Sequence, residues 1–347
     1  MPIDVKDYYG GSLDDAIHDR AHPPNVAWPN DIYRGFMEII TEYRLSNSCG
    51  DRIIKWFNES NKFEKSPLSA STKKGREFLN NINFSHLLFK EVPIITFQGI
   101  KYTLHYHLII QTIKALLFQP GLTTHFAIKY RANMEFNDGK ILQKYGEQFE
   151  SDWWKEEEKN IPMNNRLLSI ILYADSTTCD HLGKSSEHPI YLSLGNIENW
   201  RRNKPDAKVL LGYLPKLKAK DIYTGNSATF QKLQRQIFQQ CLRILLTPII
   251  NRTDMHFIVD NQIHAFTPKI SVILADMAEA GAFTAVYLPS TTKRPCCNCL
   301  VTNGDLNNMM LDNVILRTPE MMREVINCGR AKEFSIHEDP TFFWDIK

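Results

Sequence analysis

Apolar residues in the first part of the chain recur at the spacing of α-helices. The segment 30–45 presents one apolar face, made of Ile32, Phe36, Ile39, Ile40 and Tyr43. Asn30 or Asp31 is placed to cap its start. The segments 46–60 and 71–82 predict two further helices a few residues apart. Together these segments predict a small helical module.

Basic residues accompany this module, namely Arg52, Lys55, Lys73, Lys74 and Arg76. One interpretation is a helix-turn-helix that reads DNA. The other is ordinary packing of helical hairpins with a basic, solvated face, which is common. Residues 1–28 combine Gly-Gly, Pro-Pro and scattered charge without apolar periodicity, so we expect a flexible arm there.

Residues 86–106 alternate between apolar and polar positions, which predicts a β-hairpin, and residues 108–119 predict a helix. His105 and His107 share one strand face, but without an evident third ligand nearby a structural role is favoured over a metal site. We assign residues 29–150 to an α-rich N-terminal region that contains this hairpin. The next stretch, SDWWKEEEKNIP, is typical of a linker whose tryptophans pack against the following domain.

Beyond residue 165 the chain contains strongly apolar runs that are typical of strands. RLLSIILYA ends at Asp175, as expected of a central strand covered on both faces. HPIYLSLGNI and AKVLLGYLP follow after polar turns, so the three runs can form an antiparallel meander. A long amphipathic helix is predicted for residues 227–250. KISVILAD is then a fourth strand that ends at Asp276 and leads into a helix over residues 277–287.

This order of elements resembles the α/β ribonuclease H-like fold of transposases and integrases, and we assign residues 165–300 to such a core. In that fold the first and fourth strands lie side by side, which would bring Asp175 and Asp276 to one edge of the sheet. Two adjacent carboxylates repel each other unless divalent cations neutralise them. Oxygen ligands of this kind suit Mg²⁺ or Mn²⁺, and a two-metal site can promote in-line displacement at a phosphodiester. The alternative is that each Asp caps the turn or helix that follows it.

Several stretches carry a closer resemblance. ILYADSTTCDHLGKSSEHPIYLSLGNIENWRRNKPDAKVLLGYLP, ILADMAEAGAFTAVYLPSTTKRPCCNCLV and the closing FFWDIK are similar to Plavaka-type transposases of fungal DNA transposons, relatives of the CACTA group. The resemblance runs from about residue 30 to the C-terminus and is most specific between residues 167 and 300. It implies that Asp175 and Asp276 are catalytic, metal-binding members of a D-D-E/D triad.

The same resemblance leaves the third acid unplaced. The family continues beyond FFWD with a later helix that is expected to carry this acid, so residues 296–347 look like a truncated region. Acids available as substitutes are Glu320, Glu324, Glu338 and Asp339. The resemblance assigns the role to none of them. Asp180 and His181 lie close to Asp175 in the sequence and are placed either to support a metal or to serve a turn.

The stretch RPCCNCLV matches a Cys-x-x-Cys insertion of the family, with Cys296 and Cys299 in the motif positions and Cys297 extra. Two thiolates at this spacing supply half of a tetrahedral structural Zn²⁺ site. Cys328 and His337 are available to complete it. A reduced pair of cysteines without metal is the alternative.

The loop NWRRNKPDAK combines an aromatic side chain with several cations. Its candidate DNA contacts are Trp200, Arg201, Arg202, Lys204 and Lys208. LPKLKAK adds Lys216, Lys218 and Lys220. Cations that hold phosphates beside a ring that stacks on a base favour a nucleic-acid track close to the first strand. A solvated basic loop is the alternative.

Charge and cysteine usage narrow the compartment and the partners. Lys and Arg total 41 against 39 acids, so the net charge of +2 gives no overall basic field and any DNA contact must come from local patches. Seven cysteines, an odd number, and an N-terminus without a leader pattern favour an intracellular, reduced protein. No apolar run approaches the roughly 18 residues of a membrane span. Taken with the resemblance, this predicts a soluble nuclear protein.

Two functions therefore compete. The first is metal-dependent cleavage and strand transfer of double-stranded DNA at transposon ends, by a chain that is incomplete and weakly active or inactive alone. The second is a transposon-derived DNA-binding or assembly remnant without cleavage. Either form is open to homo-oligomerisation. An unrelated structural protein with capped strand ends would leave the order of elements unexplained.

Overall fold

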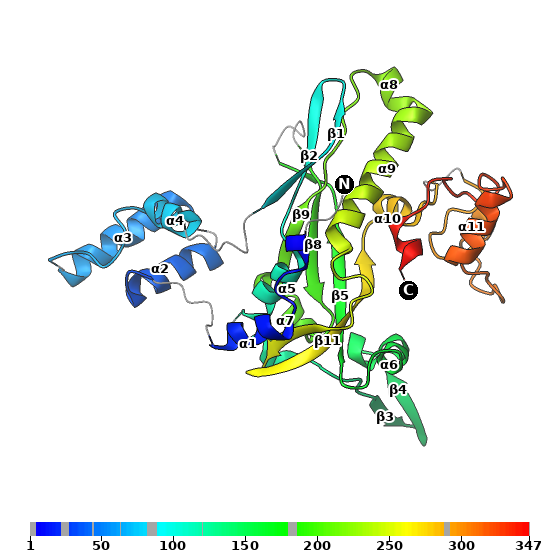
Figure 1. Ribbon diagram of the computed structural model, residues 1–347. Coiled ribbons are helices and arrows are strands. Elements are labelled where there is room, and N and C mark those ends of the chain that lie inside the picture. Colours follow the sequence, from blue (N-terminus) through cyan, green and yellow to red (C-terminus); the bar gives the residue numbers. More distant parts are fainter. Residues whose placement is uncertain are drawn as a thin grey trace. The chain divides into compact units, whose positions relative to one another are not determined.

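The computed structural model describes residues 5–21, 28–43, 45–62, 64–81, 89–119, 121–179, 186–287 and 292–346 (Figure 1). The chain divides into two compact units. The smaller comprises Ala21–Leu88, and the larger comprises Met1–Arg20 with Phe89–Lys347.

The smaller unit contains the expected helices α2 (Asp31–Glu42), α3 (Asn47–Asn61) and α4 (Thr72–Asn81). The Asn30 side chain caps α2 by accepting a hydrogen bond from the backbone N–H of Tyr33 at 2.7 Å. The unit has a hydrophobic core of its own, made of Tyr33, Phe36, Met37, Ile40, Ile54 and Leu68. The apolar periodicity predicted the helices, but the predicted buried face of the first one is partly wrong, because Ile32, Ile39 and Tyr43 are exposed.

The larger unit is built on a seven-stranded sheet with the order β1-β2-β9-β8-β5-β11-β10. The strands are β1 (Lys90–Phe97), β2 (Ile100–Tyr106), β5 (Arg166–Ala174), β8 (Pro189–Leu194), β9 (Lys208–Tyr213), β10 (Met255–Val259) and β11 (Gln262–Leu274). Neighbouring strands pair antiparallel except β5 and β11, which are parallel. The expected meander of β5, β8 and β9 and the neighbouring positions of the first and fourth predicted strands are confirmed.

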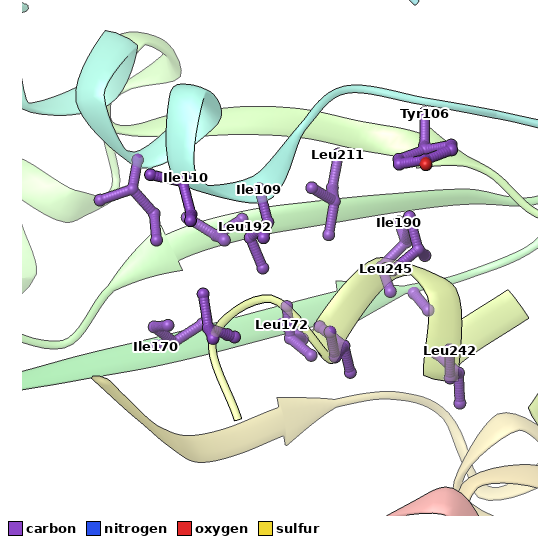
Figure 2. Packing of buried hydrophobic residues seen from close by; sticks show 14 of the residues in the cluster. Tyr106, Ile109, Ile110, Ile170, Leu172, Ile190, Leu192, Leu211, Leu242 and Leu245 are labelled. Carbon is purple, nitrogen blue, oxygen red and sulfur yellow. The ribbon is translucent and has the colours of Figure 1, made fainter. Parts of the chain in front are cut away.

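Two helices complete the main core on one face of the sheet. Figure 2 shows side chains of α5 (Ile109–Leu117) and α9 (Ala228–Leu246) packed with those of β5, β8 and β9. On β5 the alternate residues Leu168, Ile170 and Leu172 are fully buried in this cluster. Because successive strand residues point to opposite faces, Ser169, Ile171 and Tyr173 face the other side.

The β1–β2 hairpin belongs to this sheet, whereas the sequence groups it with the N-terminal helices. The register pairs His105↔Tyr213 and Tyr106↔Gly212 join β2 to β9. Gly212 permits this approach, because a Cβ there would lie 2.7 Å from the His105 carbonyl oxygen. The unit boundary therefore falls near residue 89 and not near residue 150. A pairing partner more than 100 residues away leaves no local signal in the hairpin.

The N-terminal residues correct our expectation of a flexible arm over 1–28. The described residues form a 3₁₀ turn, η1 (Val5–Tyr8), and α1 (Leu13–Ala21), and both are docked on the larger unit. Lys90 pairs with the buried Asp7 at 2.8 Å, and Lys114 pairs with Asp19 at 2.6 Å. Polar, long-range contacts hold this segment, which is why its lack of apolar periodicity was misleading.

The predicted linker is a helix, α6 (Asp152–Lys159), capped by Ser151. Trp154 is fully buried with Phe149 and Leu167, so the packing expected of this tryptophan is confirmed. The sequence also did not predict β10 or the surface hairpin of β3 (Asn133–Asn137) and β4 (Lys140–Lys144).

The remaining elements connect or follow the sheet. They are η3 (Thr123–His125), η4 (Gln148–Glu150), β6 (Thr177–Thr178), β7 (Ser186–Glu187), α7 (Asn199–Arg202), η5 (Pro205–Ala207), α8 (Ile222–Asn226), α10 (Met277–Thr284), η6 (Asn303–Asp305), α11 (Pro319–Asn327) and η7 (Phe342–Asp345). A small C-terminal core joins Val286, Met322, Val325, Ile336 and Trp344. Among the described residues, no helix is both long and apolar enough to cross a membrane.

Candidate active site at the carboxyl ends of β5 and β11

Two acids follow the only parallel pair of strands in the described sheet. The register of β5 and β11 ends with Tyr173 opposite Leu274. Asp175 and Asp276 each lie two residues beyond this pair. Parallel neighbours run side by side about 4.8 Å apart, so both acids emerge at one edge of the sheet.

Tyr173 connects the two acids electrostatically. It is the exposed residue of an otherwise buried stretch of β5, and its hydroxyl donates a hydrogen bond to Asp175 Oδ2 at 3.0 Å. This hydrogen bond raises the pKa of the Tyr173 hydroxyl, and the negative charges of Asp175 and Asp276 raise it further. Both carboxylates therefore act on the same hydroxyl. The sequence signal that we missed is an aromatic residue two positions before Asp175, a spacing that places two strand residues on the same face.

Asp276 is also the N-cap of α10. Its Oδ1 accepts a hydrogen bond from the backbone N–H of Glu279 at 2.8 Å. The capping alternative is thus realised for Asp276, and it does not conflict with a ligand role because a carboxylate has several lone pairs. Glu279 in turn lies 3.3 Å from His188 Nε2, and both side chains are largely buried.

The described residues supply two carboxylates to this edge but no group of three His, Cys, Asp or Glu side chains that could hold a metal. Asp180 and His181, the nearest polar residues in the sequence, lie outside the described residues. Asp339 is buried and accepts hydrogen bonds from Arg235 and Gln236 of α9. It is therefore engaged in holding the C-terminal segment to α9.

Lys216 brings a positive charge to the same edge. It follows β9, and its Nζ donates hydrogen bonds to Ser176 Oγ and, at 3.0 Å, to Ser186 Oγ. Ser176 directly follows Asp175 in the chain, so this contact places the ammonium group at the end of the sheet where β5 delivers Asp175. From the sequence, Lys216 was predicted only as one of several basic residues that could contact DNA.

The basic loop from Trp200 to Lys208 lies at the other end of the sheet. Asn196, four residues before Trp200, accepts a hydrogen bond from the backbone N–H of Ser169 at 2.8 Å. The six residues from Ser169 to Asp175 correspond to about 20 Å of strand. The structure therefore does not bring the basic loop and the two acids together.

The basic side chains of this loop differ in their engagement. Arg201 is buried and donates two hydrogen bonds of 2.7 Å to Asp206. Arg202 donates to the Ile197 carbonyl oxygen at 2.8 Å. Trp200 is 55% exposed, and Lys204 and Lys208 are also exposed. These last three side chains are the ones accessible to a partner.

The Cys-x-x-Cys loop is organised around Arg317, which donates hydrogen bonds to the carbonyl oxygens of Cys296 and Cys299 at 2.9 and 3.2 Å. Burial alone would raise the pKa of the Cys296 thiol, but hydrogen bonds from the Asn298 backbone and the Cys299 thiol outweigh it and lower this pKa. The two thiols are thus neighbours. Among the described residues no third Cys or His joins them into a metal-binding group, so zinc remains a prediction.

The fold and this edge define an α/β protein that presents paired acids and a cation at the ends of its central strands. A family model described as Plavaka transposase matches residues 89–346, which is most of the chain. The chain belongs to the Plavaka transposase family. A search of curated proteins gave no significant match.

Proposed function

We propose that this protein is a transposase-type enzyme that cleaves and joins DNA strands at the edge carrying Asp175 and Asp276. The observation that carries this proposal is the parallel pairing of β5 with β11, which delivers both acids to one edge. The order β9-β8-β5-β11 is also the one expected of a ribonuclease H-like core. Membership in a transposase family makes DNA the expected partner.

The donor set suits part of a magnesium or manganese site. Mg²⁺ is often held by one or two carboxylates, with waters and substrate phosphates completing its shell. Asp175 and Asp276 would hold such an ion, and a second ion would need a further acid. When bound, these ions supply positive charge opposite the attacking and leaving oxygens of an in-line displacement.

The chain's own residues position the two acids. The hydroxyl of Tyr173 orients Asp175 through its hydrogen bond, and the backbone N–H of Glu279 orients Asp276. Asp276 also sits at the N-terminus of α10, where the helix dipole stabilises its negative charge. Both carboxylates are thereby oriented, and among the described residues neither forms an ion pair.

The test is Mn²⁺ binding by calorimetry to the wild-type chain and to Asp175→Asn and Asp276→Asn. Each change removes a charge and nearly keeps the shape, and Asn also caps a helix well. Asp138→Asn is the matched control, because Asp138 lies in the exposed turn of the β3–β4 hairpin with a φ of 48° that Asn also adopts. We expect binding by the wild type and the control and more than about 100-fold weaker binding by either active-edge variant.

Metal-dependent nicking of supercoiled DNA by the same four proteins gives the functional readout. Activity lost in both active-edge variants and kept in the control supports the proposal. Mn²⁺ binding that is absent, or that survives both substitutions, overturns it.

A second candidate is a DNA-binding or assembly remnant without cleavage. It is favoured by the absence of a third metal-binding side chain among the described residues. It predicts duplex DNA binding that does not depend on divalent cations and no nicking. Under either function we propose a nuclear location, double-stranded DNA as the partner and assembly into homo-oligomers.

A further inference from the structure

The backbone around Lys216 is held on both sides. Leu214 and Leu217 are buried, and the Leu214 N–H donates to the His188 carbonyl oxygen at 2.9 Å. The N–H of Lys218 donates to the Tyr102 hydroxyl at 3.2 Å. Lys216 therefore projects from a fixed point of the fold and not from a loose surface loop.

The ammonium group of Lys216 contacts neutral oxygens. Its hydrogen-bond partners are the hydroxyls of Ser176 and Ser186, and no ion pair within 4 Å joins it to a carboxylate of the described residues. Side-chain lysine charges elsewhere in the larger unit commonly meet acids, as in Lys90 with Asp7 and Lys114 with Asp19. Within the part of the chain that the structure describes, the two serines hold the cation in place without an acid to pair with it.

This position matters for a polyanion that approaches the acids. Asp175 and Asp276 repel a phosphodiester, and a neighbouring cation offsets part of that repulsion. Lysine binds phosphate as a point charge, without the planar geometry that arginine imposes. Lys218 and Lys220 follow at two-residue spacing and are exposed.

We propose that Lys216, set by Ser176 and Ser186, binds a backbone phosphate of the DNA strand that enters the edge formed by Asp175 and Asp276. Lys216 is a positioning residue, and the inference rests on the proposed function. Its contact is sequence-independent, because phosphates carry no base information.

The test measures binding of a fluorescein-labelled duplex DNA by anisotropy over a series of salt concentrations, in EDTA so that metal binding does not contribute. Lys216→Met keeps most of the aliphatic stem and removes the charge, and Lys216→Arg keeps the charge. Lys140→Met is the matched control, because Lys140 is exposed on the β3–β4 hairpin. Thermal melting of each variant checks the fold.

We expect Lys216→Met to weaken binding and to reduce the slope of log K against log salt by about one. Lys216→Arg should restore the slope, and Lys140→Met should leave it at the wild-type value. A purely structural role of Lys216 would change melting without changing the salt slope.

The outcomes separate the two proposals. A wild-type slope in Lys216→Met, with the wild type binding DNA, overturns the phosphate contact and leaves the proposed function standing. Failure of the wild-type chain to bind duplex DNA at all overturns both.

Discussion

The two ends of the seven-stranded sheet differ in how their polar side chains are hydrogen-bonded within the protein. At the end near Ser169, the fully buried Asn196 accepts one backbone hydrogen bond and donates two, to the carbonyl oxygens of Ala127 and Leu167. The Ser169 hydroxyl donates to Gln148 Oε1 and lies 2.8 Å from the Ser271 hydroxyl, with which it also forms a hydrogen bond. At the other end Asp276 is exposed, Asp175 is half-buried, and Lys216 contacts only hydroxyls in the bonds described.

This contrast separates architecture from candidate function. Buried polar groups must be satisfied within the protein, because an unpaired one costs free energy. The network around Asn196 meets that requirement and joins the β5 end to the loop after β8. The acids and Lys216 keep capacity for an external partner, so that end is where ligand chemistry is expected.

Arginine and lysine show the same difference. The sequence predicted Arg201 as a DNA contact because it lies in a basic loop with Trp200. In the structure its guanidinium is committed to Asp206, and it organises that loop. Lys216 is one of several lysines in the same stretch of the sequence, but in the structure its ammonium group contacts Ser176, the residue that follows Asp175.

The largest expected effect on stability is at the end of the sheet near Ser169, where the buried polar groups are hydrogen-bonded. Asn196→Ala leaves the N–H of Ser169 and two buried carbonyl groups without their partner, which should lower the free energy of unfolding by about 3 kcal/mol. Urea denaturation measures the change. Asn203→Ala, an exposed position in the same loop, should change stability by less than about 0.5 kcal/mol. Equal effects of the two substitutions would mean that the hydrogen bonds of Asn196 contribute no more to the stability of the fold than an exposed side chain does.

A smaller, pH-dependent effect is expected for Asp206→Asn. Hydrogen bonds from Arg201 lower the pKa of Asp206 below its usual value of 3.8. The ionised carboxylate therefore stabilises the fold above pH 3.8, and this contribution is lost as the pH falls through the lowered pKa.

After screening by water, the variant should be about 1 kcal/mol less stable than the wild type at neutral pH. The difference should shrink as the pH falls below 3.8 and through the lowered pKa of Asp206. Urea denaturation at a series of pH values tests this. A difference that does not change with pH would show that Asp206 acts through something other than its charge, and Asp138→Asn controls for the general loss of an exposed acid.

The smallest expected effect on stability separates the role of Asp276 as the cap of α10 from its proposed role as a metal ligand. Asp276→Ala removes the cap of α10 and should cost about 1 kcal/mol, whereas Asp276→Asn keeps the cap and should cost only a few tenths. Thermal unfolding measures both. Loss of Mn²⁺ binding in the stable Asn variant would then be due to the missing charge. Equal destabilisation by Ala and Asn would contradict the separation of cap and ligand.

Much of the fold could be predicted locally. Helical periodicity predicted α2, α3 and α9, and continuous apolar runs predicted β5 and the end of β11, because burial on one or both faces leaves a repeating mark in the sequence. Asp175 and Asp276 were found because each ends such a run. The arm, the β1–β2 hairpin and α6 were assigned incorrectly or to another region, because their partners lie far away in the chain.

The sequence by itself determined which segments are apolar enough to form the sheet and its covering helices, and which acids end its central strands. Only the tertiary structure decided which charges are neighbours. Strand register sends the basic loop to one end of the sheet and the two acids to the other, and it brings Lys216 beside Ser176 across 40 residues. The physical reason is that water and salt screen the interaction between charges over short distances. The effect of a charged side chain therefore depends on distances that the folded backbone sets.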